Sequence, residues 1–138
     1  MCADFTVKGI QKSYMPSNKK QITCICTCWG SPYYFVATSS LDCLITVTNL
    51  RAANDLFSEQ YTLYGHHREI SFLATNNVLQ ILVSVDLDGE VLIHYLPSGK
   101  FLHDILLPIK DEVISQILIN ENGFIVFRST GNKIFVTK

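Results

Sequence analysis

The sequence carries little charge and lacks the basic patterns on which nucleic-acid binding depends. Of its 138 residues only 17% are charged, and the formal net charge is −1. The 11 lysines and arginines are scattered, apart from Lys19 and Lys20, so no basic stripe is present to neutralise a phosphate backbone. We therefore expect this protein to bind neither DNA nor RNA.

The sequence also lacks long apolar runs. No stretch approaches the roughly 20 apolar residues that a membrane-spanning helix needs, and residues 1–13 lack the apolar core of a signal peptide. We expect a cytoplasmic protein without direct membrane insertion, whose peripheral contact with membranes would run through partners.

Glycine and cysteine are few, and their spacing argues against phosphate and metal sites. The 7 glycines all stand singly, so no glycine-rich loop can cradle a phosphate. The 5 cysteines are an odd number without an export signal, which favours free thiols over disulfides. Cys24, Cys26 and Cys28 are two residues apart, which puts them in a row on one face of a strand and not around a zinc ion. We expect buried thiols, no metal and no cofactor.

What the sequence does have is a high content of apolar and β-branched residues, with the clearest order in residues 63–96. Segments 70–75, 81–85 and 90–96 have the composition of strands, and polar turns separate them at 76–77 and 86–89. The third segment alternates with period two. Three short strands bury little surface alone, so this unit predicts copies of itself on either side.

The same order of strands and turns recurs before and after this unit. Asp42 corresponds to Asp88 at an offset of 46 residues, and Gly131 corresponds to Asp88 at an offset of 43. Residues 60–64 and 100–107 supply fourth strands. A period of this size with four strands fits the blade of a WD-type propeller, and the strand-like composition excludes a helical solenoid.

We therefore expect an all-β chain, a partial β-propeller of about three four-stranded antiparallel WD-type blades. The blades are predicted at about 22–62, 63–107 and 108–138, with 1–21 as an N-terminal extension or stray outer strand. A propeller ring needs about four blades or more. The sequence leaves open whether the chain belongs to a longer protein, associates with itself or uses further blades to close the ring.

Gly65-His66, Ser84 and Asp88-Gly89 resemble the signature positions of a WD repeat. In that family a His, a Ser or Thr, a turn Asp and a Trp of the third strand form a hydrogen-bonded network within each blade. The resemblance implies that His66, Ser84 and Asp88 form such a structural network here. The Trp-Asp pair is replaced by His94-Tyr95, which leaves the fourth role undefined.

Within residues 63–107, LYGHHREI and ILVSVDLDGEVLIHYLPSGKFL are similar to the C-terminal propeller of BEACH-domain proteins of the neurobeachin and lysosomal-trafficking-regulator type. Blades there commonly contain LYGH, VSGS and DGT. This chain departs from the pattern at Val85-Asp86-Leu87 and in the missing Trp. The resemblance implies a non-catalytic scaffold for protein partners in vesicle and membrane traffic.

Two loops of the central unit are candidates for the partner-binding rim. We expect His67, Arg68 and Glu69 to share a rim with Asp86 and Leu87, because the corresponding loops of such propellers open on one side. The mixed charge around one apolar residue suits a protein partner and not an anionic polymer. Trp29, Tyr33, Tyr34 and Phe35 form a recognition patch or pack between blades, and the sequence does not choose.

His66, Asp86 and Asp88 also admit a chemical interpretation, as a metal site or as the acid–base cluster of a small all-β hydrolase. No nucleophile, oxyanion nest or third ligand accompanies them in the local sequence. We expect a binding module and not an enzyme.

Overall fold

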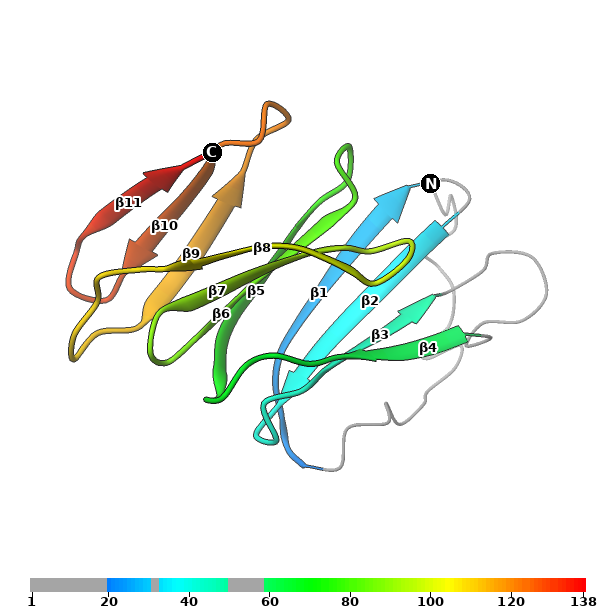
Figure 1. Ribbon diagram of the computed structural model, residues 1–138, viewed down its shortest axis with the longest axis horizontal. Coiled ribbons are helices and arrows are strands. Elements are labelled where there is room, and N and C mark those ends of the chain that lie inside the picture. The colour runs from blue at the N-terminus through cyan, green and yellow to red at the C-terminus, as the bar shows by residue number, and fades with distance from the viewer. Residues whose placement is uncertain (1–19, 31–32, 50–58) are drawn as a thin grey trace, which may run out of the picture.

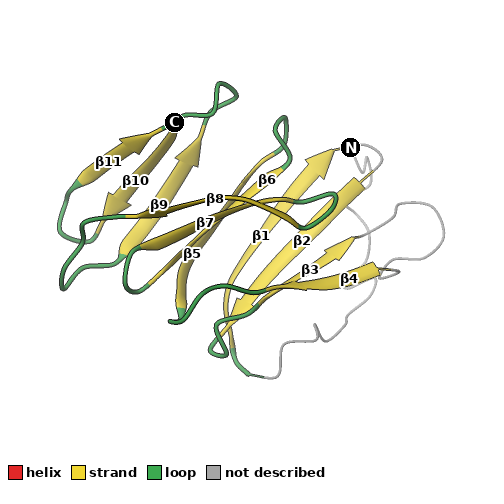
Figure 2. Cartoon of the chain, viewed as in Figure 1, coloured by secondary structure: helices red, strands yellow, loops and turns green. Residues whose placement is uncertain are grey.

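In the computed structural model, residues 20–30, 33–49 and 59–138 are described, and the regular elements within these ranges are all strands (Figure 2). The strands form three antiparallel sheets that follow one another along the chain (Figure 1). The all-β class and the three sequential sheets expected from the repeat are confirmed. The N-terminal extension up to residue 19 lies outside the described residues.

The first and the central sheet each have four strands, hydrogen-bonded in chain order. The first sheet consists of β1 (Ile22–Gly30), β2 (Tyr33–Ser40), β3 (Ile45–Asn49) and β4 (Glu59–Leu63). The central sheet consists of β5 (Ile70–Asn76), β6 (Ile81–Asp86), β7 (Glu90–Tyr95) and β8 (Lys100–Leu106).

The third sheet differs from the expected blade, because its described part has three strands and not four. It consists of β9 (Ile114–Ile119), β10 (Ile125–Ser129) and β11 (Ile134–Thr137).

Two apolar cores hold the three sheets together. Between the first and central sheets, Phe35 and Val47 pack with Leu73 and Leu82. Between the central and third sheets, Val83 and Val91 pack with residues that include Ile125 and Phe127. β5 contacts both β1 and β9, so the first strands of the three sheets lie side by side (Figure 1). Side chains alternate between the two faces of a strand, so the central sheet can turn one apolar face to each of its two neighbours.

No helix among the described residues is long and apolar enough to cross a membrane.

Candidate functional site

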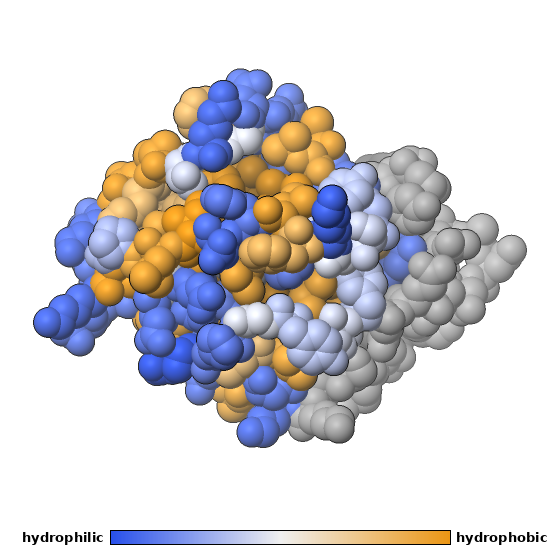
Figure 3. Space-filling view, in the orientation of Figure 1, coloured by the Kyte–Doolittle hydropathy of each residue, from blue (hydrophilic) through white to orange (hydrophobic). Residues whose placement is uncertain are grey.

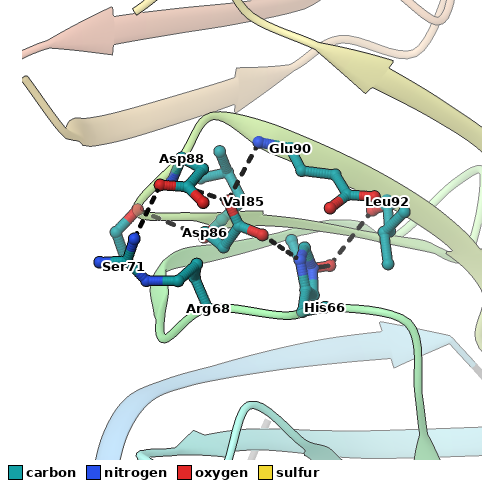
Figure 4. A network of polar contacts seen from close by, with 9 residues as sticks. His66, Arg68, Ser71, Val85, Asp86, Asp88, Glu90 and Leu92 are labelled. Carbon is teal, nitrogen blue, oxygen red and sulfur yellow. Dashed lines mark hydrogen bonds and ion pairs between the residues drawn. The ribbon is translucent and has the colours of Figure 1, made fainter. Parts of the chain in front are cut away.

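A chain of three buried polar side chains lies at one end of the central sheet (Figure 4). Ser84 and Asp86 are two residues apart in β6, so they point to the same face of the sheet. His66, from the loop before β5, lies between them, with its Nε2 2.8 Å from Ser84 Oγ and its Nδ1 3.0 Å from Asp86 Oδ2. A carboxylate only accepts hydrogen bonds, so Nδ1–H is the donor to Asp86, and Nε2 is the ring nitrogen that bonds the Ser84 hydroxyl.

The same carboxylate also holds the turn that follows β6. Asp86 Oδ1 accepts hydrogen bonds from the backbone N–H groups of Asp88 at 2.9 Å and Glu90 at 3.1 Å. Ser84 Oγ lies 3.3 Å from the carbonyl oxygen of Leu92, its partner residue in β7. The chain therefore connects the loop before β5, the strand β6, the turn and β7, and we refer to His66, Ser84 and Asp86 together as the fastener.

The structure corrects the assignment of Asp88 to this network. Asp86 is the last residue of β6 and is 1% exposed, whereas Asp88 lies in the turn with its side chain 59% exposed. Asp88 pairs instead with Arg68, with 3.0 Å between Nη1 and Oδ1. The physical reason is side-chain direction, because Asp86 shares the face of Ser84 while the turn directs Asp88 to solvent.

The predicted rim is brought together, but without Asp86. His67, Arg68 and Glu69 are exposed and Leu87 is partly exposed. The backbone N–H of Leu87 donates to the carbonyl oxygen of Glu69 at 3.0 Å, which ties the two loops side by side. Asp86 is buried beneath them and cannot touch a partner, so Asp88 takes its place in the rim.

A hollow of about 380 Å³ adjoins the rim where the central and third sheets meet. It is lined by Leu87, Asp88, Asp111, Glu112, Val113 and Thr130. The hydrogen bond from Ser129 and then the one from Lys133 hold the pKa of Glu112 below its usual value, so this carboxyl is an anion. Sequence reasoning missed the hollow, and its one local signal was the pair Asp111-Glu112 between two repeats.

The fastener has the connectivity of a hydrolase triad, because a Ser, a His and an Asp are hydrogen-bonded in that order. Ser84, however, is 0% exposed, so a substrate carbonyl cannot approach its hydroxyl. His66, Asp86 and Glu90 also bring potential metal ligand atoms within 4.8 Å of one another. Both ring nitrogens and both carboxylate oxygens already bind protein groups, so the arrangement fits a structural role better than an ion.

The neighbouring sheets also have polar groups at the same place. Ser40 and Ser129 occupy the register position of Asp86, since these three residues pair with Ile22, Ile114 and Ile70 respectively. Ser40 hydrogen-bonds the carboxylate of Asp42, and Ser129 Oγ lies 2.5 Å from Glu112 Oε1. All three sheets therefore place a hydrogen-bonded polar side chain at this register position.

His94, at the position where a WD repeat has its Trp, is a second buried imidazole of the central sheet. It is 3% exposed, and its ring lies against Phe101 with 5.7 Å between centroids. Its Nδ1 has no hydrogen-bond partner within the described part of the chain. Burial, and then the neighbouring His66, lower the pKa of His94 below its ordinary value of 6.5.

The cysteines of β1 face the central sheet, as their spacing predicts. The Sγ atoms of Cys24 and Cys28 lie 3.6 Å from the carbonyl oxygens of Ile70 and Asn76. Cys28 is fully buried, and burial followed by the charges of Cys28 and Cys24 raises the pKa of Cys26 to about 12.

The aromatic group at the β1–β2 turn divides between surface and core. Trp29 is half-exposed and lies 5.3 Å from the ring of Tyr34, whereas Phe35 is buried between the sheets. The side chain of Tyr33 lies outside the described residues. Phe35 therefore packs between blades, and the role of the other aromatic residues stays open.

No protein-family model and no curated protein match this sequence. The structure, in contrast, is similar to solved propellers. Hsv2 of Kluyveromyces lactis superposes with a TM-score of 0.73 at 12% identity, over 83% of this chain and 36% of that one. The WD40 domain of Toxoplasma gondii coronin gives 0.66 at 16% identity, over 86% and 31%. This chain has the WD40 β-propeller fold.

The chain spans only about a third of these solved structures, so it corresponds to part of a propeller. Likeness at this level of identity establishes the fold alone, and neither structure bears on the resemblance to BEACH-domain proteins.

Proposed function

We propose that this chain is a non-catalytic interaction module that binds another protein through the rim of its central WD40 blade. The rim consists of His67, Arg68, Glu69, Leu87 and Asp88. The observation that carries the proposal is the joining of its two loops, by the Leu87–Glu69 backbone hydrogen bond and the Arg68–Asp88 ion pair. Loops held by a rigid sheet beneath them are a common arrangement for recognition.

The composition of the rim suggests which partner it fits. Arg68 and Glu69 carry opposite charges beside Leu87, and the acidic hollow begins at Leu87 and Asp88. A polar border around an apolar residue is typical of transient protein interfaces. Of the three carboxylates that line the hollow, Asp88 pairs with Arg68 and Glu112 with Lys133, so Asp111 is the group that favours a partner segment with a Lys or Arg.

Photo-crosslinking tests this proposal directly. A photoreactive amino acid at position 67 or 87 should capture a protein partner in cells, and Arg68→Glu should reduce the captured product at least fivefold. The matched control places the same group at Val78, which is 65% exposed in the β5–β6 turn. Equal capture from positions 78 and 87 would contradict a specific rim.

A role in membrane traffic is a further proposal, and the resemblance of residues 63–107 to BEACH-type propellers is its support. Its test is the identity of the crosslinked partner. Recovery of vesicle-coat or membrane-tethering proteins from position 87 supports it, and recovery of partners unrelated to membranes contradicts it.

The alternative function is a hydrolase that uses the His66 and Asp86 cluster. One observation favours it, which is that Ser84, His66 and Asp86 are hydrogen-bonded in the order of a hydrolase triad. A fluorophosphonate probe, which labels activated serines, distinguishes the two functions. We expect no labelling of Ser84 in the folded chain because the hydroxyl is closed to solvent, and labelling that Ser84→Ala abolishes would favour the hydrolase.

A further inference from the structure

The three sheets present the same face to the next sheet along the chain. Register identifies equivalent rows across the strands, which are Cys26–Ala37–Val47 in the first sheet, Ala74–Val83–Ile93 in the central sheet and Leu118–Val126–Val136 in the third. The first row packs against the central sheet, and the second packs against the third sheet. We call this side of each sheet its receiving face.

The receiving face of the third sheet keeps its apolar character where no described sheet covers it. Leu118 is 60% exposed, Val136 is 62% exposed, and the adjacent Ile134 is 67% exposed. A hollow of about 150 Å³ lies on this face, lined by Gln116, Leu118, Val126, Arg128 and Ile134. Figure 3 shows apolar surface (orange) among polar residues on the side where Figure 1 places β9 to β11. Large exposed apolar side chains gathered on one face indicate a contact surface.

The opposite side of each sheet carries a pair of aliphatic residues at the start of its first strand. These pairs are Ile22 and Ile25, Ile70 and Leu73, and Ile114 and Ile117, and the register makes them equivalent. The pairs in β5 and β9 are buried against the receiving face of the preceding sheet. Ile22 and Ile25 in β1 are 42% and 67% exposed. We call the pair in β1 the inserting pair.

The described sheets thus expose the receiving face of the third sheet and, in β1, the equivalent of the pair that packs against such a face in the other two sheets. We propose that two copies associate head to tail, with the inserting pair of each copy against the receiving face of the other copy's third sheet. Two copies supply six sheets, within the roughly four to eight blades of closed propellers, whereas three copies supply nine. Head-to-tail contacts form a ring when the rotation between copies closes, and the proposed ring is the one that closes after two copies. This surface is separate from the rim, so the inference goes beyond the proposed function.

Light scattering of the purified chain measures the assembly. The expected mass is twice the 15.6 kDa of the chain. Leu118→Asp, and separately Ile25→Asp, should each give monomers that retain the strand signal in circular dichroism, because both side chains are exposed in the single copy. Val78→Asp, an equally exposed apolar residue in the β5–β6 turn, should stay dimeric.

Mixing the two monomeric variants tests the head-to-tail geometry. A pair made of one Leu118→Asp copy and one Ile25→Asp copy has one contact with both substitutions and one contact with neither. We expect the mixture to recover a dimer, with an affinity at least tenfold below that of the unsubstituted chain. A monomeric unsubstituted chain, or loss of the dimer with Leu118→Asp but not with Ile25→Asp, would overturn the proposal.

Discussion

Asp86 and Asp88 are two residues apart, and the structure predicts opposite consequences for their removal. Asp86 is buried and accepts hydrogen bonds from His66 and two backbone N–H groups, whereas Asp88 is exposed. Asp86→Ala should lower the free energy of unfolding by about 2–3 kcal/mol, because one buried and two part-buried donors lose their acceptor. Asp88→Ala should change it by less than about 1 kcal/mol, since exposed ion pairs contribute little. Urea unfolding of both variants measures the difference, and equal losses would contradict the assignment of Asp86.

His94 gives the stability a pH dependence whose sign follows from its burial. Its pKa in the fold is lowered, first by burial and then by His66, while the unfolded chain has the ordinary value of about 6.5. Below about pH 6.5 the unfolded chain therefore binds a proton that the folded chain does not, so stability falls as the pH falls below this value. We expect unfolding at a lower urea concentration at pH 5.5 than at pH 7.5.

A pair of substitutions isolates the contribution of His94. His94→Phe keeps an aromatic ring beside Phe101 and removes the titrating group, so the urea midpoint should depend less on pH between 5.5 and 7.5. His67→Gln removes an exposed imidazole and serves as the control. Its urea midpoint should depend on pH as that of the unsubstituted chain does. An unchanged pH dependence in His94→Phe would show that another group is responsible.

At the scale of strands and turns, the sequence was sufficient for most of the fold. β5, β6 and β7 were predicted to within one or two residues, because their apolar runs are bounded by turn residues and the copies repeat at a nearly constant offset. The burial of Asp86 and its hydrogen bond to His66 were not predicted. A family signature gives the residue type at each position, but it does not give the direction of a side chain at the end of a strand. The acidic hollow was not predicted either, since it joins Leu87 to Thr130 across two sheets.

The β6–β7 turn should tolerate substitution less than the comparable β9–β10 turn. Gly89 and Gly123 both have a positive φ, +87° and +89°, which favours glycine. A Cβ at Gly89 would lie 2.7 Å from Ile109 Cγ1 and 2.9 Å from the carbonyl oxygen of Leu107, whereas a Cβ at Gly123 would meet nothing within 4 Å. Gly123→Ala should therefore destabilise by about 1 kcal/mol, from the backbone alone. Gly89→Ala should cost about 2–4 kcal/mol, because the contacts add steric strain. Thermal unfolding of both variants tests this order. Similar losses of stability in the two variants would contradict it.

At the scale of the whole molecule, the three packed sheets carry two exposed surfaces, the rim and the receiving face of the third sheet. The cores between neighbouring sheets and the fastener of the central blade hold the sheets in place. The rim lies directly above the fastener, so its loops are held in place by buried groups that no partner touches. Stability and recognition should therefore be separable by substitution, although the residues concerned lie within two positions of one another.

The most direct measurement compares Arg68→Glu with Asp86→Ala for both the thermal midpoint and the yield of partner crosslinked from position 87. The account predicts that Arg68→Glu keeps the midpoint within about 2 °C and loses most of the crosslink, because Arg68 is exposed in the rim. Asp86→Ala should lower the midpoint by roughly 8 °C or more, because it breaks the fastener. At a temperature where that variant is still folded, it should keep most of the crosslink. An Arg68→Glu variant that unfolds like Asp86→Ala, or one that retains the full crosslink, would contradict the account.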